Sequence, residues 1–386
     1  MDASSVIELR QYALQPGRRE DLIALFEDEF IEPQRAAGIR LLGQFRDLDV
    51  ADRFVWLRGF RDMPARAEAL RSFYGGPVWA ANRNAANATM VDSDNVLLLR
   101  PADERESPLL QAGTSLLVAT IYLLAAPVDD AFQRLFASRA MPLLAAAGAP
   151  VAARFQTEYA KNDFPALPVR EGEHAFVWFS RFPSPLDYER HLVELRRSRE
   201  WREVVEPEVA RRLASPAQVL RLEPTARSLQ MHITGALHDF DFLAGDWTIR
   251  NRRLRVRGAG SSDWDEFPAT SHVALHLGGI ANVDEIRFPT QGWSGMTIRT
   301  FDPETRKWSI YWVNSRTGTL FPPVAGGFAG ERGEFYGDDE DGGRPVKVRY
   351  IWTRLGEDAA RWEQAFSLDG RKWETNWVMD LTRPGR

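Results

Sequence analysis

Three polar side chains near the N-terminus stand two residues apart in a segment that alternates with apolar residues. Glu8, Arg10 and Tyr12 share one parity of residues 6–14. In a β-strand, residues two apart point to the same face, so these side chains would form one cluster. We predict a catalytic group in which Tyr12 donates a proton and Arg10 clamps an anion, with Glu8 as its third member. The alternative is a structural ion pair within the sheet.

A second group of polar side chains lies in the last third of the chain. Asn282, Asp284 and Glu285 follow a Gly-Gly-Ile turn, and Arg299 lies in the next alternating segment. A few convergent polar groups in an otherwise apolar cavity are the usual composition of a small-molecule site. The other predicted ligand-binding residues are His276, Tyr311, Glu363 and Trp377.

Several kinds of chemistry are excluded by the composition. The sequence has no cysteine, so disulfides, thiolate nucleophiles and cysteine-ligated metals are ruled out. His272 and His276 are four residues apart, but on a strand this spacing separates them by roughly 13 Å, too far to share a metal ion. The sequence shows no phosphate-binding loop, dinucleotide fingerprint or nucleophile elbow. We therefore predict no metal site.

Charge and hydropathy bear on partners and compartment. The net charge is −5 and no basic run is interleaved with aromatic residues, so we expect neither nucleic acid nor a membrane as partner. The first 21 residues lack the basic and apolar segments of a signal peptide. The longest nearly apolar run, residues 116–128, is shorter than the roughly 18 residues of a membrane span. We expect a cytoplasmic protein.

The segments that surround the first cluster occur twice. Residues 54–60 read FVWLRGF and residues 176–182 read FVWFSRF, 122 positions later. Upstream, Tyr12 has a counterpart in Tyr122 at an offset of 110. A repeat at fixed spacing indicates two copies of one structural unit.

The difference between the two offsets requires an insertion of 12 residues in the second copy. It falls within residues 156–173, a polar stretch with proline and glycine that we predict to be a long hairpin loop. The predicted copies are residues 1–101 and 115–224, joined by residues 102–114.

Each copy has the same predicted order of elements, βαββαβ, which is the ferredoxin-like plan. Such a sheet carries helices on one face only, and both parities of its strands are too apolar to leave one face in water. Two copies packed sheet against sheet would form a pseudo-dimeric α/β barrel, and we expect Glu8, Arg10 and Tyr12 to face its cavity. In copy one the predicted elements are strands at 6–14, 41–45, 53–60 and 96–100, with helices at 19–36 and 64–87.

ELRQY at residues 8–12 and FVWLRGF at residues 54–60 resemble the NIPSNAP family within the dimeric α/β-barrel group. The resemblance is good in copy one, whereas copy two has Val118 and Thr120 in place of Glu8 and Arg10. It implies the barrel fold and does not indicate an activity, because related barrels include cofactor-independent monooxygenases, haem-using enzymes and small-molecule cyclases or isomerases. We predict no cofactor, with haem as the alternative.

Residues 236–386 differ in type from the two copies. Short alternating segments separated by turns such as Gly342-Gly343 predict an up-and-down antiparallel barrel of about eight or more strands. Gly245-Asp-Trp247 resembles the Gly-x-Trp signature of lipocalin-like (calycin) barrels, and the segments after it resemble a bacterial lipocalin-like family of unknown function. The resemblance implies that Trp247 closes the barrel floor and that Arg383 covers it.

The lining of this barrel depends on which parity of its strands points inward. With the tryptophan-rich faces inward, as Trp377 would be, the barrel would be nearly filled. With the faces of Tyr311, Arg299 and Glu363 inward, it would hold a polar cavity. Strand register decides between the two arrangements.

The leading hypothesis is a two-module α+β protein that binds a small apolar or aromatic molecule. It would transform that molecule by acid–base chemistry in a barrel cavity, without an organic cofactor. The alternatives are a non-catalytic carrier or scaffold, in which the pseudo-dimeric module is an assembly surface, and a haem-binding redox protein. Homo-oligomers are compatible with each hypothesis.

Overall fold

The computed structural model describes residues 4–102 and 109–384, which divide into two compact units. Unit 1 contains both copies of the repeat and ends at Ser228, and unit 2 contains the rest of the chain together with residues 111–113. Part of the predicted linker, residues 103–108, lies outside the described residues.

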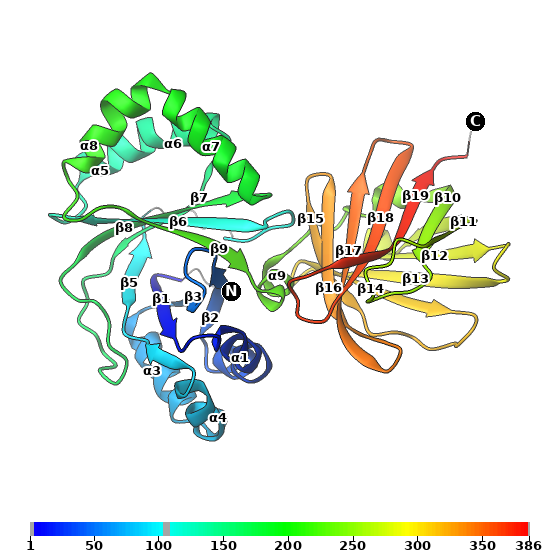
Figure 1. The fold of residues 1–386 in the computed structure, drawn as a ribbon, viewed down its shortest axis with the longest axis horizontal. Helices are drawn as coiled ribbons and strands as arrows, with labels where there is room; N and C mark the ends of the chain where they lie inside the picture. Colours follow the sequence, from blue (N-terminus) through cyan, green and yellow to red (C-terminus); the bar gives the residue numbers. More distant parts are fainter. Residues whose placement is uncertain (1–3, 103–108, 385–386) are drawn as a thin grey trace. The chain divides into compact units, whose positions relative to one another are not determined.

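Copy one is an antiparallel sheet with the strand order β2-β3-β1-β5 and helices on one of its faces (Figure 1). The long helix predicted over residues 19–36 is one helical run that contains a π-helical turn, η1. The strands are β1 (Val6–Leu14), β2 (Arg40–Asp47), β3 (Arg53–Phe60), β4 (Met90–Asp92) and β5 (Val96–Pro101). The helices are α1 (Arg19–Leu25), η1 (Phe26–Phe30), α2 (Ile31–Ala36), α3 (Met63–Tyr74) and α4 (Pro77–Asn87).

Copy two repeats this plan, with the strand order β7-β8-β6-β9. Its strands are β6 (Leu116–Leu124), β7 (Val151–Thr157), β8 (His174–Phe182) and β9 (Gln218–Pro224). Its helices are α5 (Asp130–Leu135), η2 (Phe136–Ala140), α6 (Met141–Ala146), α7 (Pro185–Arg197), η3 (Trp201–Val205) and α8 (Glu206–Ala210). Across the described residues, no helix reaches the length and apolar character needed to cross a bilayer.

The two sheets close into one eight-stranded antiparallel barrel, with the helices outside it (Figure 1). Strand β2 pairs with β9, where Phe45 lies opposite Pro224. Strand β5 pairs with β7, where Leu99 lies opposite Thr157. Neither copy closes a barrel alone, so the predicted fusion of two ferredoxin-like sheets is confirmed at the level of the fold.

Apolar side chains of both copies fill the interior of this barrel. Copy one contributes Ile7, Leu9 and Leu57, and copy two contributes Leu117 and Val177, each fully buried. Burying a side chain of this kind stabilises a protein by roughly 1.5–3 kcal/mol. The faces that would be too apolar for water are therefore the faces that the two copies bury against each other.

Unit 2 is a closed antiparallel barrel of ten strands in sequential order, in which β10 pairs with β19. Its buried core contains Trp247, Trp308, Trp362 and Trp377, so the tryptophan-rich faces point inward. The strands are β10 (Gly245–Leu254), β11 (Trp264–His276), β12 (Ala281–Phe288), β13 (Trp293–Asp302), β14 (Lys307–Asn314), β15 (Val324–Ala329), β16 (Arg332–Asp341), β17 (Arg344–Arg354), β18 (Ala359–Ser367) and β19 (Glu374–Thr382). The short helices are α9 (Ala226–His232), which runs into this unit, η4 (Asp241–Leu243) and η5 (Leu277–Gly279).

The start and the end of the barrel meet at Trp247 and Arg383. The Arg383 guanidinium carbon lies 3.9 Å from the centre of the Trp247 ring. The same guanidinium donates to the carbonyl oxygens of Phe242 at 2.9 Å and Asp246 at 3.1 Å. The Trp247 indole N–H donates to the carbonyl oxygen of Leu243 at 2.7 Å. Arg383, just after β19, is therefore held over the first strand of the barrel.

Substitution of Arg383 by alanine should destabilise unit 2 by about 1–2 kcal/mol, because it removes a cation–π contact and two charge-assisted hydrogen bonds. Denaturant unfolding followed by tryptophan fluorescence measures this, since most tryptophans follow residue 240. Arg250→Ala is the matched control: its ion pair with Glu266 is mostly exposed, and it should cost about 0.5 kcal/mol or less. Equal losses in the two variants would contradict the role given to Arg383.

Candidate functional site

Glu8 is the centre of a buried ion cluster in copy one. Its carboxylate accepts hydrogen bonds from Arg10 Nη1, Arg58 Nε and Arg66 Nε, each at 2.7 Å. Glu8, Arg58 and Arg66 are completely buried, and Arg10 is 1% exposed. Arg10 lies on β1 with Glu8, Arg58 lies on β3 directly opposite Glu8, and Arg66 lies on α3.

The predicted location of this cluster in the barrel cavity is wrong. Ile7 and Leu9 of β1 face the barrel interior, and the alternation of the strand therefore turns Glu8, Arg10 and Tyr12 toward the helices. The prediction that the three side chains share a face holds. The error arose because alternation separates two faces without showing which one is covered by the second copy.

Three positive charges dominate the electrostatics around Glu8. Burial alone would raise the pKa of Glu8, but Arg58, Arg10 and Arg66 outweigh it and hold that pKa well below its usual range. Glu8 is therefore an anion in the folded protein at neutral pH. It cannot act as a general base near neutral pH, and it positions the arginines instead.

Two tyrosine hydroxyls lie beside the arginines. Arg10 Nε donates to Tyr12 Oη at 2.9 Å, and Arg58 Nη1 donates to Tyr74 Oη at 3.3 Å. Burial raises the pKa of Tyr12, and the opposing effect of Arg10 offsets only part of that shift. Tyr12 therefore keeps its proton at neutral pH. Because an arginine N–H can only donate, the tyrosine oxygen is the acceptor and its own proton is available to another group.

Tyr12 and Tyr74 line a small aromatic cavity between the sheet and the helices. Its volume is about 30 Å³, which is space for one or two water molecules. The Phe26 and Trp56 rings meet edge to face, with centroids 4.9 Å apart, and Tyr74 meets Trp79 at the same distance. The remaining lining residues are Leu22, Phe30, Gln34, Phe73 and Met90.

The NIPSNAP family profile matches the part of the chain that contains this cluster, residues 7–103. Residues 7–103 are a NIPSNAP domain. The match covers the strands and helices of copy one, so the cluster and the aromatic cavity belong to the NIPSNAP domain. No match was found among curated proteins.

Three solved structures that are similar to this chain have low sequence identity to it. A proposed monooxygenase from Lactobacillus acidophilus NCFM is 14% identical, with a TM-score of 0.37, over 57% of this chain and 94% of that chain. An anthrone oxidase-like protein is 12% identical, with a TM-score of 0.39, over 58% and 92%. An uncharacterized NIPSNAP domain protein from Burkholderia xenovorans is 19% identical, with a TM-score of 0.24, over 26% and 97%. At these sequence identities and TM-scores, the activities of these proteins say nothing about the activity of this chain.

Copy two has the same frame without the charges. Strand register places Val118 opposite Ser180, where the NIPSNAP domain has Glu8 opposite Arg58. Only the tyrosine is kept, and burial raises the pKa of Tyr122 to about 12. The space between the copy-two sheet and its helices is filled by an apolar cluster that includes Phe132, Phe136 and Phe176. The ion cluster is therefore particular to the NIPSNAP domain.

In unit 2 the structure brings together only part of the predicted ligand-binding set. Arg299 donates to Asn282 Oδ1 and to Asp284 Oδ2, both at 2.7 Å, inside the barrel. Trp377 is also buried, and its indole N–H donates to Asn251 at 3.0 Å. The other members lie elsewhere: His276 is exposed, Glu285 is exposed and pairs with Arg287, and Tyr311 and Glu363 are half-buried beside the inward-facing Ile310 and Trp362.

The haem alternative does not fit the aromatic cavity. In the present structure the cavity of about 30 Å³ is far too small for a macrocycle, and residues 7–103 contain no histidine to ligate its iron. In copy two, His191 lies 3.0 Å from the carbonyl oxygen of Ala147, and His174 lies 2.9 Å from the Tyr159 hydroxyl. Within the described parts of the chain, acidic residues and histidines form no group of three or more suited to a metal ion.

Sequence reasoning missed the arginines that complete the cluster. Arg58 lies in FVWLRGF and Arg66 follows it on α3, which begins where Asp62 caps the backbone N–H of Ala65 at 2.7 Å. The signal was present, because copy two has serine and tyrosine, Ser180 and Tyr188, at the offset of 122. Both copies share the same barrel frame. A charged residue that only one copy has is therefore not required by that frame and points to another role.

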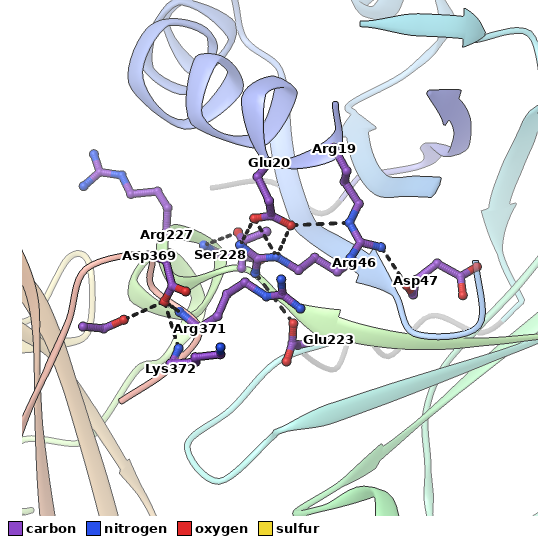
Figure 2. Close-up of polar contacts among 12 residues, drawn as sticks. Arg19, Glu20, Arg46, Asp47, Glu223, Arg227, Ser228, Asp369, Arg371 and Lys372 are labelled. Atoms are coloured by element: carbon purple, nitrogen blue, oxygen red, sulfur yellow. Dashed lines mark hydrogen bonds and ion pairs between the residues drawn. The ribbon is translucent and has the colours of Figure 1, made fainter. Parts of the chain in front are cut away.

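A second ion network in unit 1 is more exposed and serves as a comparison. Glu20 of α1 is approached by Arg19 and Arg46 (Figure 2). Its carboxylate accepts from Arg46 Nη2 at 2.7 Å, but the Glu20 side chain is 43% exposed. Arg46 lies on β2 beside the seam with β9 and is buried, so this network ties a helix to the barrel through a partly exposed carboxylate.

Glu8→Gln should destabilise unit 1 by about 3–5 kcal/mol, because it leaves three arginines buried without their shared counter-ion. Denaturant unfolding followed by helical circular dichroism measures this, since α1–α8 lie in unit 1. Glu32→Gln is the control, because Glu32 is 63% exposed and pairs with Arg35 on the surface, which predicts a loss of about 0.5 kcal/mol or less. If both variants lost a similar amount of unfolding free energy, the buried cluster would not be a major source of the stability of unit 1.

Acid should destabilise the wild-type protein more steeply than the Glu8→Gln variant. The pKa of Glu8 is depressed in the folded state, so its stabilisation is complete above the unfolded pKa, about 4.5, and is lost as pH falls toward the folded pKa. Between about pH 5 and pH 2, the wild type should lose up to about 1.4 kcal/mol more per pH unit than the variant. Parallel stability curves in this window would show that Glu8 titrates normally.

Proposed function

We propose that the NIPSNAP domain binds a small planar aromatic molecule that carries a carbonyl or phenolic oxygen. The observation that carries this proposal is the pair of arginine-bound tyrosine hydroxyls, Tyr12 and Tyr74, at the edge of a cavity whose other walls are aromatic. Flat rings would stack on the aromatic walls. The ligand oxygen would accept hydrogen bonds from the Tyr12 and Tyr74 hydroxyls.

The chemistry that this arrangement supports best is stabilisation of an oxyanion. A tyrosine that donates to a carbonyl oxygen while accepting from an arginine strengthens its hydrogen bond as negative charge develops. The charge of Arg10 lies one hydrogen bond behind Tyr12. The NIPSNAP domain would thus favour the enolate or phenolate form of its ligand, and because no carboxylate or histidine is among the described residues that line the cavity, the released proton would pass to water. In the alternative, a carrier, the same groups would bind the ligand without proton transfer.

Access to the cavity requires movement of its walls, since its present volume of about 30 Å³ is smaller than a ligand of one or two rings. Tyr74 and Trp79 flank the break between α3 and α4 at Gly75 and Gly76. The helical wall is therefore interrupted beside the cavity, whereas the sheet wall is fixed by the barrel. We propose that the helical side opens to admit the ligand.

For unit 2 we propose a lipocalin-like (calycin) relationship. Its support is the ten-stranded closed barrel, together with the stacking of Arg383 on Trp247 near the two ends of the strand series. The inward-facing tryptophans leave the Arg299, Asn282 and Asp284 group as the polar part of the interior. We place the ligand chemistry of the protein in the NIPSNAP domain.

Tyr12→Phe should weaken binding of 2-tetralone, a bicyclic ketone, by about five- to tenfold, because one charge-assisted hydrogen bond is lost. Isothermal titration of the full chain measures this, and tetralin, which lacks the oxygen, should bind both proteins equally. Tyr122→Phe is the matched control, since it removes the equivalent hydroxyl from copy two. Deuterium incorporation next to the ketone in heavy water, measured by NMR, separates a catalyst from a carrier.

Two outcomes would contradict the proposal. One is that 2-tetralone and tetralin both fail to bind at millimolar concentration. The other is that Tyr12→Phe and Tyr122→Phe reduce binding equally, which would place the effect outside the NIPSNAP domain. If 2-tetralone binds but exchanges no deuterium faster than in buffer, the carrier alternative is favoured.

A further inference from the structure

The insertion that distinguishes copy two reaches over the site in copy one. It lies between β7 and β8, and the backbone N–H groups of Glu158 and Arg170 donate to the carbonyl oxygens of Leu98 and Val96 on β5, both at 2.9 Å. The Phe164 ring lies against Tyr74, with centroids 6.1 Å apart. The segment 158–172 therefore pairs with β5 and reaches Tyr74, one of the residues that line the NIPSNAP domain's cavity.

The same segment also contributes a charge to the ion cluster. Arg66 Nη1 donates to Asn162 Oδ1 at 3.1 Å and to the carboxylate of Asp163. Arg66 is completely buried, whereas Asp163 is 28% exposed. Asp163 thus lies between solvent and the buried guanidinium. A carboxylate on an inserted loop is one of the partners that allow Arg66 to be buried.

Positive charge still exceeds negative charge after this contact. In the described part of the chain, the carboxylates within ion-pair distance of Arg10, Arg58 and Arg66 are those of Glu8 and Asp163. The cluster therefore keeps one uncompensated positive charge. A buried charge without compensation is costly, which makes the site receptive to a single negative charge.

Two donors in the cluster lack an acceptor. Among the described residues, no hydrogen-bond partner is present for Nη2 of Arg58 or Nη2 of Arg66, although both atoms are buried. Both guanidinium groups are held by the same carboxylate, that of Glu8. Planar arginine groups with free N–H donors match the geometry of a carboxylate.

We infer that the ligand of the NIPSNAP domain is an aromatic carbonyl or phenolic compound that also carries a single carboxylate. This rests on the proposed function and narrows its ligand class. The ring occupies the aromatic cavity once its helical wall has moved, beside Tyr12 and Tyr74, and the carboxylate accepts from the free Nη2 groups of Arg58 and Arg66. One negative charge neutralises the cluster, so a monoanion fits better than a dianionic phosphate ester. The segment that carries Asp163 closes over the bound ligand.

The test compares 2-naphthoate with 2-naphthamide, which has the same shape and no charge, by isothermal titration against the full chain. The wild type should bind 2-naphthoate at least about tenfold more tightly, because only the carboxylate compensates the excess charge. Equal affinities for the two probes would overturn the inference and leave the proposed function intact. Failure of 2-naphthoate, 2-naphthamide and 2-tetralone alike to bind would instead remove the proposed function.

Asp163→Asn provides a second, local readout that does not disturb Glu8. It removes a negative charge beside Arg66, so affinity for 2-naphthoate should rise by about threefold or more, while affinity for 2-naphthamide stays unchanged. Glu158→Gln, which removes a carboxylate from the same segment without contacting Arg66, should change neither affinity. An unchanged or weaker affinity for 2-naphthoate in Asp163→Asn would overturn the inference, because it would place the anion elsewhere.

Discussion

A carboxylate removed from water needs opposite charge and hydrogen bonds on both oxygens, and Glu8 obtains them from three arginines. Much of the local architecture of copy one serves that arrangement. Pairing of β1 with β3 brings Arg58 opposite Glu8, and the Asp62 cap starts α3 so that Arg66 reaches the same carboxylate. The arginines in turn hold the two tyrosine hydroxyls at the cavity. The polar chemistry of the site is thus organised by a residue that does not itself titrate near neutral pH.

The duplicated fold separates the stability of the barrel from the chemistry beside it. Both copies give an apolar sheet face to the shared interior, and those faces remain alike. On the helix side the copies have diverged, with Val118 and Ser180 in place of an ion pair. Copy two then contributes to the charged site in another way, through the inserted segment that carries Asp163. The two copies therefore share the same fold. They differ in the ion cluster, which only copy one has, and in the inserted segment, which only copy two has.

The order of elements, the repeat and the two barrels follow from local patterns, and the sequence predicted them. The sequence did not show which face of each strand points into the barrel. In β1, Ile7 and Leu9 alternate with Glu8 and Arg10, and alternation alone does not say which of the two sets is inside. The two partners of Glu8 that were missed, Arg58 and Arg66, are 50 and 58 residues away from it, and Asp163 reaches Arg66 across 97 residues. Such contacts depend on tertiary packing. In unit 2 the same ambiguity left the direction of Tyr311 and Glu363 open until the strand register was known.

The position of the site on the helix side has a mechanical consequence. Opening the barrel interior would break pairing between strands, whereas admitting a ligand between sheet and helices displaces side chains and helical segments. The π-helical turn at Phe26–Phe30 recurs at Phe136–Ala140, at the repeat offset of 110. It supports the view that the helix side, and not the barrel interior, is the adaptable part of each copy. In copy one it places Phe26 and Phe30 on the cavity, while in copy two the Phe136 ring packs against Phe176. Because the turn is shared, we infer that a helical irregularity of the common frame became a cavity wall where the charged cluster was kept.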